Sequence, residues 1–170
     1  PCPAYNQTTG QWAPNFGGGG AHITGGGGNY GGGATGAASW DGGFATAPQA
    51  GQVYGISDLS LIFFGSGGGG VWNGSPGNPG PGGDGGGIIY IGALTINAVS
   101  ASSFSAQGNS TVHWAIGSYT YGAGGGAGGS IYLEALNTSL SSGTVDVSGG
   151  FGYTSVIRNG GHGGSGRSVY

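Results

Sequence analysis

Charged residues are scarce in this sequence. Only 4% of its 170 residues are charged, and they comprise two arginines, no lysine and five acidic residues, for a formal net charge of −3. Soluble domains are typically about 25% charged. A chain with so few positive charges has no basic surface that would neutralise a run of phosphates or bind an anionic membrane. The composition therefore argues against nucleic-acid binding and against electrostatic binding to membranes.

Methionine is absent, and cysteine occurs only once, as Cys2. A single cysteine excludes an internal disulfide and predicts an intermolecular bridge, a free thiol or a small buried side chain. The longest apolar run, residues 59–64, is interrupted by Ser60 and is far too short to span a membrane as a helix. Since the sequence starts with Pro1, Cys2 and Pro3, we interpret it as a processed product or a piece of a longer protein.

Glycine, by contrast, makes up 48 of the 170 residues. Glycine-rich sequences without a period are often disordered. This sequence, however, is 36% hydrophobic and 11% aromatic, and disordered linkers contain few such residues. Collagen is excluded because glycine does not recur strictly at every third position. The composition predicts an ordered chain whose apolar core consists of thin strips.

Glycine tracts alternate with short apolar segments along most of the chain. The tracts occupy residues 17–20, 25–28, 31–33, 67–70, 82–87, 122–129 and 160–166, and the apolar segments occupy 52–64, 88–98, 102–106, 131–136 and 144–148. The apolar segments favour strands, because they are rich in β-branched and aromatic residues and none has the apolar period of a helix. We therefore predict an all-β or irregular fold without significant helix, with strands near 88–97 and 131–136.

The glycine tracts have no side chains to bury, so another interaction must offset the high entropy cost of ordering them. Without Cβ atoms, extended glycine chains can pack side by side and join through N–H···O and Cα–H···O contacts. We expect extended tracts of the polyglycine II type, left-handed and with three residues per turn. The alternative is that the tracts are flexible loops between ordered strands.

The sequence contains an internal repeat of about 40 residues, a length typical of stacked repeat architectures. Residues 85–94 match 127–136, and each copy is followed by a second short strand, at 104–108 and at 145–150. A third copy begins at Gly163. The pattern predicts short strands in a layered or solenoid-like arrangement.

An aliphatic or aromatic strand directly follows several of the glycine tracts. Examples are Gly85-Gly86-Gly87-Ile88-Ile89-Tyr90-Ile91 and Gly128-Gly129-Ser130-Ile131-Tyr132-Leu133-Glu134-Ala135. In this respect residues 17–170 resemble modules of very large secreted or cell-surface glycine-rich proteins of protists and bacteria. The resemblance implies an extracellular, elongated, β-rich structural role. Polyglycine-helix bundles of phage tail-fibre tip adhesins and of a springtail antifreeze protein also look similar, without shared motifs.

No arrangement of residues in the sequence predicts catalysis or metal binding. Gly-x-Gly-x-x-Gly strings arise by chance in so glycine-rich a chain, and no lysine is present for a phosphate-binding loop. His22, His113 and His162 have no histidine or acidic residue within four positions, whereas metal sites use close ligand pairs. The sequence has no Gly-x-Ser-x-Gly nucleophile elbow. We expect a protein that is not an enzyme and that binds no cofactor or metal.

Four Asn-x-Ser/Thr sequons occur in the chain, where about one or two are expected by chance. Their acceptor residues are Asn6, Asn73, Asn109 and Asn137. Each is predicted at a strand end or in a polar turn, where a glycan is accommodated. Glycans would also keep a chain with so little charge in solution. We therefore predict N-glycosylation at these positions, with chance occurrence of the sequons as the alternative.

Residues 1–16 differ in composition from the rest, so we divide the chain into an extended N-terminal arm, 1–16, and a glycine-rich repeat domain, 17–170. In the arm, Tyr5 and Trp12 are suited to contact a neighbouring molecule, and Cys2 is placed to form a disulfide with it. We expect a secreted, cell-surface structural subunit that binds copies of itself through this arm and forms a filament, appendage or coat. The alternative is an adhesin that binds glycans or a receptor, and ice binding is a weaker third hypothesis.

Overall fold

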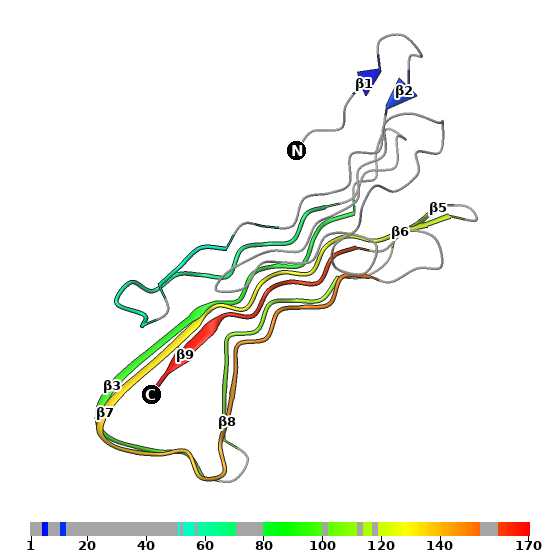
Figure 1. The fold of residues 1–170 in the computed structure, drawn as a ribbon. Coiled ribbons are helices and arrows are strands. Elements are labelled where there is room, and N and C mark those ends of the chain that lie inside the picture. The colour runs from blue at the N-terminus through cyan, green and yellow to red at the C-terminus, as the bar shows by residue number, and fades with distance from the viewer. Residues whose placement is uncertain are drawn as a thin grey trace.

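The computed structural model of the chain contains short strands and no helix among the residues that it describes (Figure 1). The described residues are 5–6, 11–12, 51, 53–56, 58–70, 80–99, 102–111, 114–116, 119–153 and 160–170. The strands are β1 (Tyr5–Asn6), β2 (Gln11–Trp12), β3 (Ile88–Asn97), β4 (Ser103–Ser105), β5 (Trp114–Ile116), β6 (Tyr119–Tyr121), β7 (Ser130–Ser139), β8 (Thr144–Asp146) and β9 (Arg167–Val169). The predicted all-β character is therefore confirmed for this part of the chain.

The largest sheet aligns three successive repeats in parallel. Its strand order is β3-β7-β9, and both strand pairs are parallel. Ile88 pairs with Ser130, 42 positions later, and Ser130 pairs with Arg167, 37 positions later. The sequence repeat matched 85–94 with 127–136, which is the same offset as the pairing of β3 with β7. The two strands predicted from the sequence are confirmed, and the offset of the repeat equals the offset of their pairing.

In a second parallel pair of strands the chain returns alongside the first sheet. β4 pairs with β8, with Phe104 opposite Val145. In each of the first two repeats the chain runs out along β3 or β7, turns, and returns along β4 or β8 (Figure 1). Ile131 and Leu133 of β7 are buried, and Phe104, Leu140 and Val145 pack against this cluster. The side-chain core is thus a thin strip between the outgoing and the returning strands.

Next to this strip, the interior consists of backbone packed on backbone. Residues 122–131 are buried without interruption, and the first eight of them are all glycine or alanine. The N–H groups of this tract donate in turn to three neighbouring segments. Gly124 and Ala127 donate to Gly69 and Ser66, Gly125 and Gly128 to Gly161 and Gly164, and Gly126 and Gly129 to Asn109 and Ala106. The hydrogen-bond partner therefore changes with a period of three residues, and the tract is held by three separate segments.

Close backbone contacts explain why so many of these positions are glycine. A Cβ atom on Gly68 would come within 1.9 Å of the Gly124 carbonyl oxygen, a distance that no side chain tolerates. On the adjacent Gly67, which is exposed, a Cβ atom would lie 3.5 Å from the Gly83 carbonyl oxygen, which is ordinary van der Waals contact. The requirement for glycine is thus specific to the positions that face another segment.

The apolar segment at residues 52–64 differs from its expected β character, because its described residues contain no strand. Leu59 has a left-handed backbone with φ of 55°, and its N–H donates to the Ile56 carbonyl oxygen at 3.2 Å. Left-handed backbone is unfavourable for a leucine, but the Leu59 side chain is only 3% exposed. Burial of this side chain offsets the strain and fixes a turn where the composition alone indicated a strand.

Two antiparallel pairs account for the remaining described strands. β1 pairs with β2, with Tyr5 opposite Trp12, and β5 pairs with β6, with Trp114 opposite Tyr121. The two aromatic residues predicted to contact a neighbouring molecule are therefore pairing partners within the arm. Cys2, the third residue of that prediction, lies outside the residues that the structure describes.

Candidate functional surface

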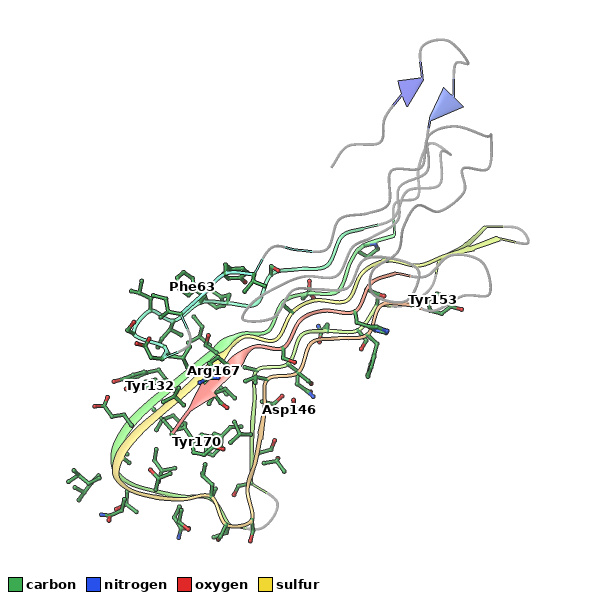
Figure 2. All side chains as sticks on the ribbon, in the orientation of Figure 1. Phe63, Tyr132, Asp146, Tyr153, Arg167 and Tyr170 are labelled. Carbon is green, nitrogen blue, oxygen red and sulfur yellow. The ribbon has the colours of Figure 1, made fainter. Side chains whose placement is uncertain are left out.

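One face of the three-stranded sheet is exposed, and it is the candidate functional surface. Strand alternation places on it Tyr90, Gly92 and Leu94 of β3 with Tyr132, Glu134 and Leu136 of β7, and we call these six residues the tyrosine face. Leu94 is 71% exposed and Leu136 is 81% exposed. In Figure 2, Tyr132 lies on the side of the sheet away from Asp146 of β8. The opposite face carries the buried residues of the core strip.

Tyr90 and Tyr132 stack on each other across the two strands. The residues are direct pairing partners, their ring centroids are 5.5 Å apart, and the rings are nearly parallel, at 6°. Such cross-strand aromatic pairs stabilise a sheet beyond the apolar area that they bury. Tyr90 is 56% exposed, so the stack is reached from solvent. The parallel register of the repeats therefore builds an exposed pair of phenol rings from two identical positions of the repeat.

A carboxylate lies next to this stack. The Tyr90 hydroxyl donates to Glu134 Oε2 at 2.9 Å, across the diagonal between β3 and β7. This hydrogen bond, followed by the negative charge of Glu134, raises the pKa of the Tyr90 phenol above its ordinary value. The pair therefore holds Tyr90 protonated, with an acceptor in place for its proton.

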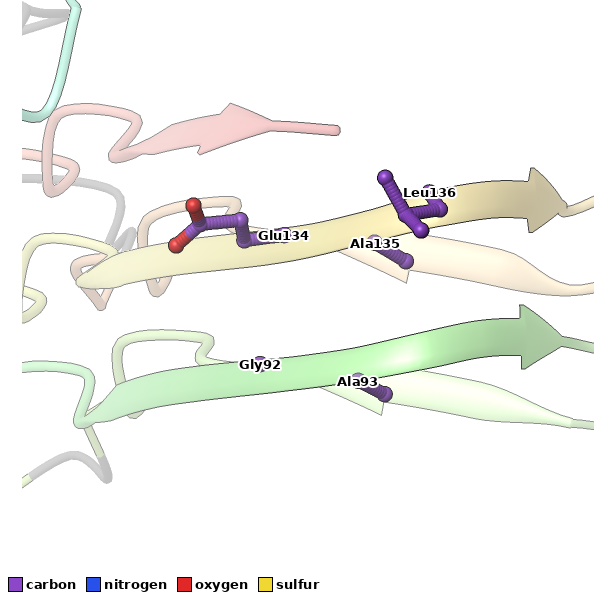
Figure 3. A pocket seen from close by; sticks show the side chains of 5 residues that line it. All are labelled: Gly92, Ala93, Glu134, Ala135 and Leu136. Atoms are coloured by element: carbon purple, nitrogen blue, oxygen red, sulfur yellow. The ribbon is translucent and has the colours of Figure 1, made fainter.

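A shallow depression adjoins the stack, as shown in Figure 3. It has a volume of about 360 Å³ and is lined by Gly92, Ala93, Glu134, Ala135 and Leu136. Gly92 is the pairing partner of Glu134 and carries no side chain, which leaves the space directly opposite Glu134 open and lets Tyr90 reach it diagonally. The depression is open and presents one carboxylate and one leucine, which suits surface contact rather than enclosure of a small molecule.

The sheet also has unpaired edges among the residues that the structure describes. β3 pairs only with β7 there, so the other edge of residues 88–97 carries no strand partner. β9 pairs with residues 130–132 of β7, so the same edge of 133–139 has no described partner strand. Unpaired edges are templates for pairing with another chain. Natural proteins often protect them with lysine or proline, but neither occurs in β3 or β7.

Polar contacts elsewhere in the described residues link successive repeats. The Gln107 side chain on the first returning segment donates to the carboxylate of Asp146 and to Ser148 Oγ on the second. The Ser148 N–H also donates to Asp146 Oδ1 at 2.9 Å. This backbone hydrogen bond, followed by one from the Ser148 side chain, is the largest cause of a lowered pKa for the Asp146 carboxyl. These groups join the repeats side by side.

The predicted glycosylation sites divide between described and undescribed residues. Asn109 and Asn137 are both exposed. Asn109 adjoins a second shallow depression of about 220 Å³, between residues 81–84 and 109–111. Asn6 lies in β1 opposite Gln11, and Asn73 lies outside the residues that the structure describes. Glycosylation at the four positions stays a prediction.

Of the three histidines, only His162 belongs to the described residues. Its Nδ1 accepts a hydrogen bond from the Gly152 N–H at 3.2 Å, and its ring meets Phe151 edge to face at 5.4 Å. Among the described residues, no group of three or more histidine, cysteine or acidic side chains is placed to hold a metal ion. In the same part of the chain, no helix has the length and apolar character needed to cross a membrane.

Sequence reasoning did not identify the tyrosine face. The signal was present, because the repeat that aligns 85–94 with 127–136 puts Tyr90 at the same position as Tyr132. It becomes visible only when the two copies are assumed to pair in parallel and in register, and the sequence alone does not fix that assumption.

A scan of the chain against protein-family models finds no matching family. Comparisons with curated proteins and with solved structures find no match either. The function of the chain is therefore inferred from its own residues and their geometry.

Proposed function

We propose that this chain is a structural subunit of an extracellular filament, surface appendage or coat, and that it assembles with copies of itself. The observation that carries the proposal is the parallel, in-register stacking of successive repeats, together with the unpaired edges of β3 and β7 among the described residues. A stack of this kind has no intrinsic end, because each repeat presents the same backbone groups that bound the previous one. The proposal gives the chain no catalytic step and no cofactor.

The proposed architecture is a solenoid-like stack whose glycine tracts are of the polyglycine II type. It is supported by the period of three in the hydrogen-bond partners of residues 122–129, because an extended helix with three residues per turn presents each third N–H to the same neighbour. It is also supported by the uninterrupted burial of this tract, which a flexible loop would not have. The architecture suits a stiff spacer more than an enclosed binding pocket.

The low charge of the chain supports the proposal that other copies of the chain cover its exposed surface. With 4% charged residues the chain has little electrostatic repulsion between copies, and Leu94, Leu136 and Tyr90 are all more than half exposed. Soluble monomers rarely leave such apolar groups and open strand edges together without charges around them. Head-to-tail contact between copies covers one edge and leaves another free, and contact that does not close into a ring gives a fibre.

The N-terminal arm is the proposed connector between copies. Tyr5 and Trp12 would contact the neighbouring molecule as aromatic anchors, and Cys2 would form the covalent link. A secreted, cell-surface location agrees with the lone cysteine, the four sequons and the resemblance to glycine-rich modules of large surface proteins. Glycans at these sequons would keep the assembled material hydrated.

Deletion of residues 1–16 tests the proposal. The full chain should polymerise as its concentration rises, as seen by light scattering and electron microscopy, and the truncated chain should stay monomeric with an unchanged circular-dichroism spectrum. A full-length variant with Tyr5→Ala and Trp12→Ala is the matched control, because it removes the two anchoring side chains and keeps the rest of the arm. Regular filaments from the truncated chain would refute the role of the arm. A full chain that remains a monodisperse monomer at high concentration would refute the structural-subunit proposal.

The alternative function is a glycan- or receptor-binding adhesin, and the tyrosine face supports it. Exposed aromatic rings beside a carboxylate are groups that recognise sugars, through stacking and hydrogen bonds to hydroxyls. An adhesin would bind a glycan array as a monomer. The Tyr90→Ala variant would lose this binding. The control variant Tyr170→Ala, which changes another exposed tyrosine, would keep it. Filaments without glycan binding favour the structural subunit.

A further inference from the structure

The stacked tyrosines belong to two different repeats, Tyr90 to the first and Tyr132 to the second. We propose that Tyr90 and Tyr132 form an oxidative cross-linking site, at which a haem peroxidase using hydrogen peroxide joins the two phenol rings into a dityrosine. The inference needs only that the chain meets such an oxidant, and it stands apart from filament formation.

The geometry of Tyr90 and Tyr132 suits this coupling. The rings are 5.5 Å apart at their centroids and nearly parallel, on directly paired residues of neighbouring strands. Their side chains stand on the exposed face of the sheet, where rotation about the side-chain bonds can bring the ring carbons next to the hydroxyls together. Tyr54, in contrast, meets Phe63 edge to face at 6.0 Å, and phenylalanine gives no phenoxyl radical.

Glu134 makes Tyr90 the ring that is oxidised first. A neutral phenol loses an electron readily only when its proton leaves at the same time, and the Tyr90 hydroxyl already donates to Glu134 Oε2 at 2.9 Å. Since the carboxylate takes up that proton, the phenoxyl radical forms on Tyr90 without a charged intermediate. Tyr132 lies against this radical and is the nearest phenol in the same stack.

The reaction balances in atoms and electrons. Each phenol gives up one electron and its hydroxyl proton, and the two phenoxyl radicals join by a carbon–carbon bond between the positions next to their oxygens. The hydrogen on each joined carbon then moves to the phenol oxygen and restores the aromatic ring. Two electrons and two protons in total convert one hydrogen peroxide into two waters, so the chain loses two hydrogen atoms.

The bond would connect one repeat to the next at the exposed face. The backbone hydrogen bonds between β3 and β7 already set the two residues side by side, so the cross-link requires no rearrangement of the sheet. It would also close the chain segment between Tyr90 and Tyr132, which restricts the unfolded state as a disulfide does. A structure with no possible internal disulfide would thereby gain a covalent brace.

The test treats dilute full-length protein with a haem peroxidase and hydrogen peroxide. The monomer should gain dityrosine fluorescence and lose the mass of two hydrogens, and tandem mass spectrometry of peptic fragments should locate the bond between Tyr90 and Tyr132. Tyr90→Phe and Tyr132→Phe should each abolish the intramolecular product while keeping the stacked rings and the fold. Tyr170→Phe, which changes another exposed tyrosine, should leave the product unchanged.

Glu134→Gln tests the proton acceptor separately. The variant keeps a hydrogen-bond acceptor beside Tyr90 but replaces the carboxylate by a far weaker base, so the initial rate of cross-linking should fall by about tenfold or more. The proposal is overturned if the intramolecular product persists in both phenylalanine variants, or if the oxidised wild type yields only intermolecular products. An unchanged rate in Glu134→Gln overturns the assigned role of the carboxylate.

Discussion

Gly126 lies directly against the backbone of Asp84, and a Cβ atom on Gly126 would come within 1.9 Å of the Asp84 carbonyl oxygen. The same glycine donates its N–H to the Asn109 carbonyl oxygen at 3.0 Å. Its backbone is therefore enclosed by two segments from the preceding repeat. At this position the absence of a side chain is what permits the contact, so the glycine contributes to stability through the backbones that it allows to approach.

Replacement of Gly126 by alanine should therefore destabilise the fold strongly. The obstructing atom belongs to the backbone, so the clash is relieved only by moving one whole segment away from the other. We expect a loss of about 3 kcal/mol or more in the free energy of unfolding, measured by urea denaturation followed by circular dichroism.

Gly87→Ala is the matched control for this prediction. A Cβ atom on Gly87 meets nothing within 4 Å, and its backbone is outside the left-handed region that favours glycine. The substitution should change the unfolding free energy by less than about 1 kcal/mol, on the stabilising side, since alanine restricts the unfolded chain. Equal effects of the two substitutions would contradict the packing of backbone on backbone.

The repeat and its strands were predictable from the sequence because they depend on local composition. Residues 88–91 and 131–133 are aliphatic and aromatic, and two similar copies at a fixed offset favour parallel stacking. The enclosure of Gly126 was not predictable residue by residue, because every glycine in a tract looks alike until the neighbouring segments are placed. The tertiary structure decides which glycine of a tract lies against another segment.

The second prediction compares a buried and an exposed residue of the same strand, β7. Ile131 of β7 is 0% exposed, whereas Leu136 of the same strand projects into solvent. Ile131→Ala should lower the free energy of unfolding by about 2–5 kcal/mol, because it removes buried apolar contacts and leaves a cavity. Leu136→Ala should change it by no more than about 0.5 kcal/mol. Urea denaturation of both variants measures the difference, and similar losses would contradict the assignment of the two faces.

The turn at Leu59 shows where sequence reasoning fails for a physical reason. Its apolar residues resemble those of a strand in composition, and no local signal marks Leu59 as the residue that takes a left-handed backbone. The turn forms because burial of the Leu59 side chain outweighs its backbone preference. A choice of this kind depends on what the side chain packs against, which a single sequence does not reveal.

Acid should weaken the fold through Asp146. The hydrogen bonds from Ser148, and then the one from Gln107, lower the pKa of this carboxyl in the folded state relative to the unfolded state. The unfolded chain thus binds the proton at a higher pH, so the contribution of Asp146 is present above its ordinary pKa and is lost as the pH falls through the folded value. The free energy of unfolding should therefore decrease as the pH falls below the ordinary pKa of an aspartate and on through the lower pKa of the folded state.

The variant Asp146→Asn isolates this contribution. It should flatten the pH dependence of urea denaturation in the acidic range without removing it, because the Ser60 hydrogen bonds lower the pKa of Asp58 in the same direction. If the wild type and the variant lose stability with the same slope, the Asp146 carboxylate is not held by these bonds in solution.

The last prediction concerns the modification of Asn109 and Asn137. Both side chains are exposed, and the backbone N–H and carbonyl groups of Asn109 bind Asp84 and Gly126. The Asn109 side chain adds only a long hydrogen bond, from Nδ2 to Asp84 Oδ2 at 3.5 Å, and a glycosylated Nδ2 keeps one N–H. A glycan on either residue therefore leaves the packing intact.

The hydroxyl of Thr111, which completes the Asn109 sequon, donates to the Ala123 carbonyl oxygen at 3.0 Å and accepts from the Tyr153 N–H at 3.1 Å. In the folded chain this hydroxyl is engaged on both sides, so a glycosylating enzyme must reach the sequon before the repeats stack. Expression through a eukaryotic secretory pathway should then add glycan to at least two of the four sequons, and Asn109→Gln and Asn137→Gln should each remove one glycan mass. The refolded, unmodified protein should not accept glycan at Asn109. An intact mass of the secreted chain equal to the bare 16.2 kDa would reject the prediction.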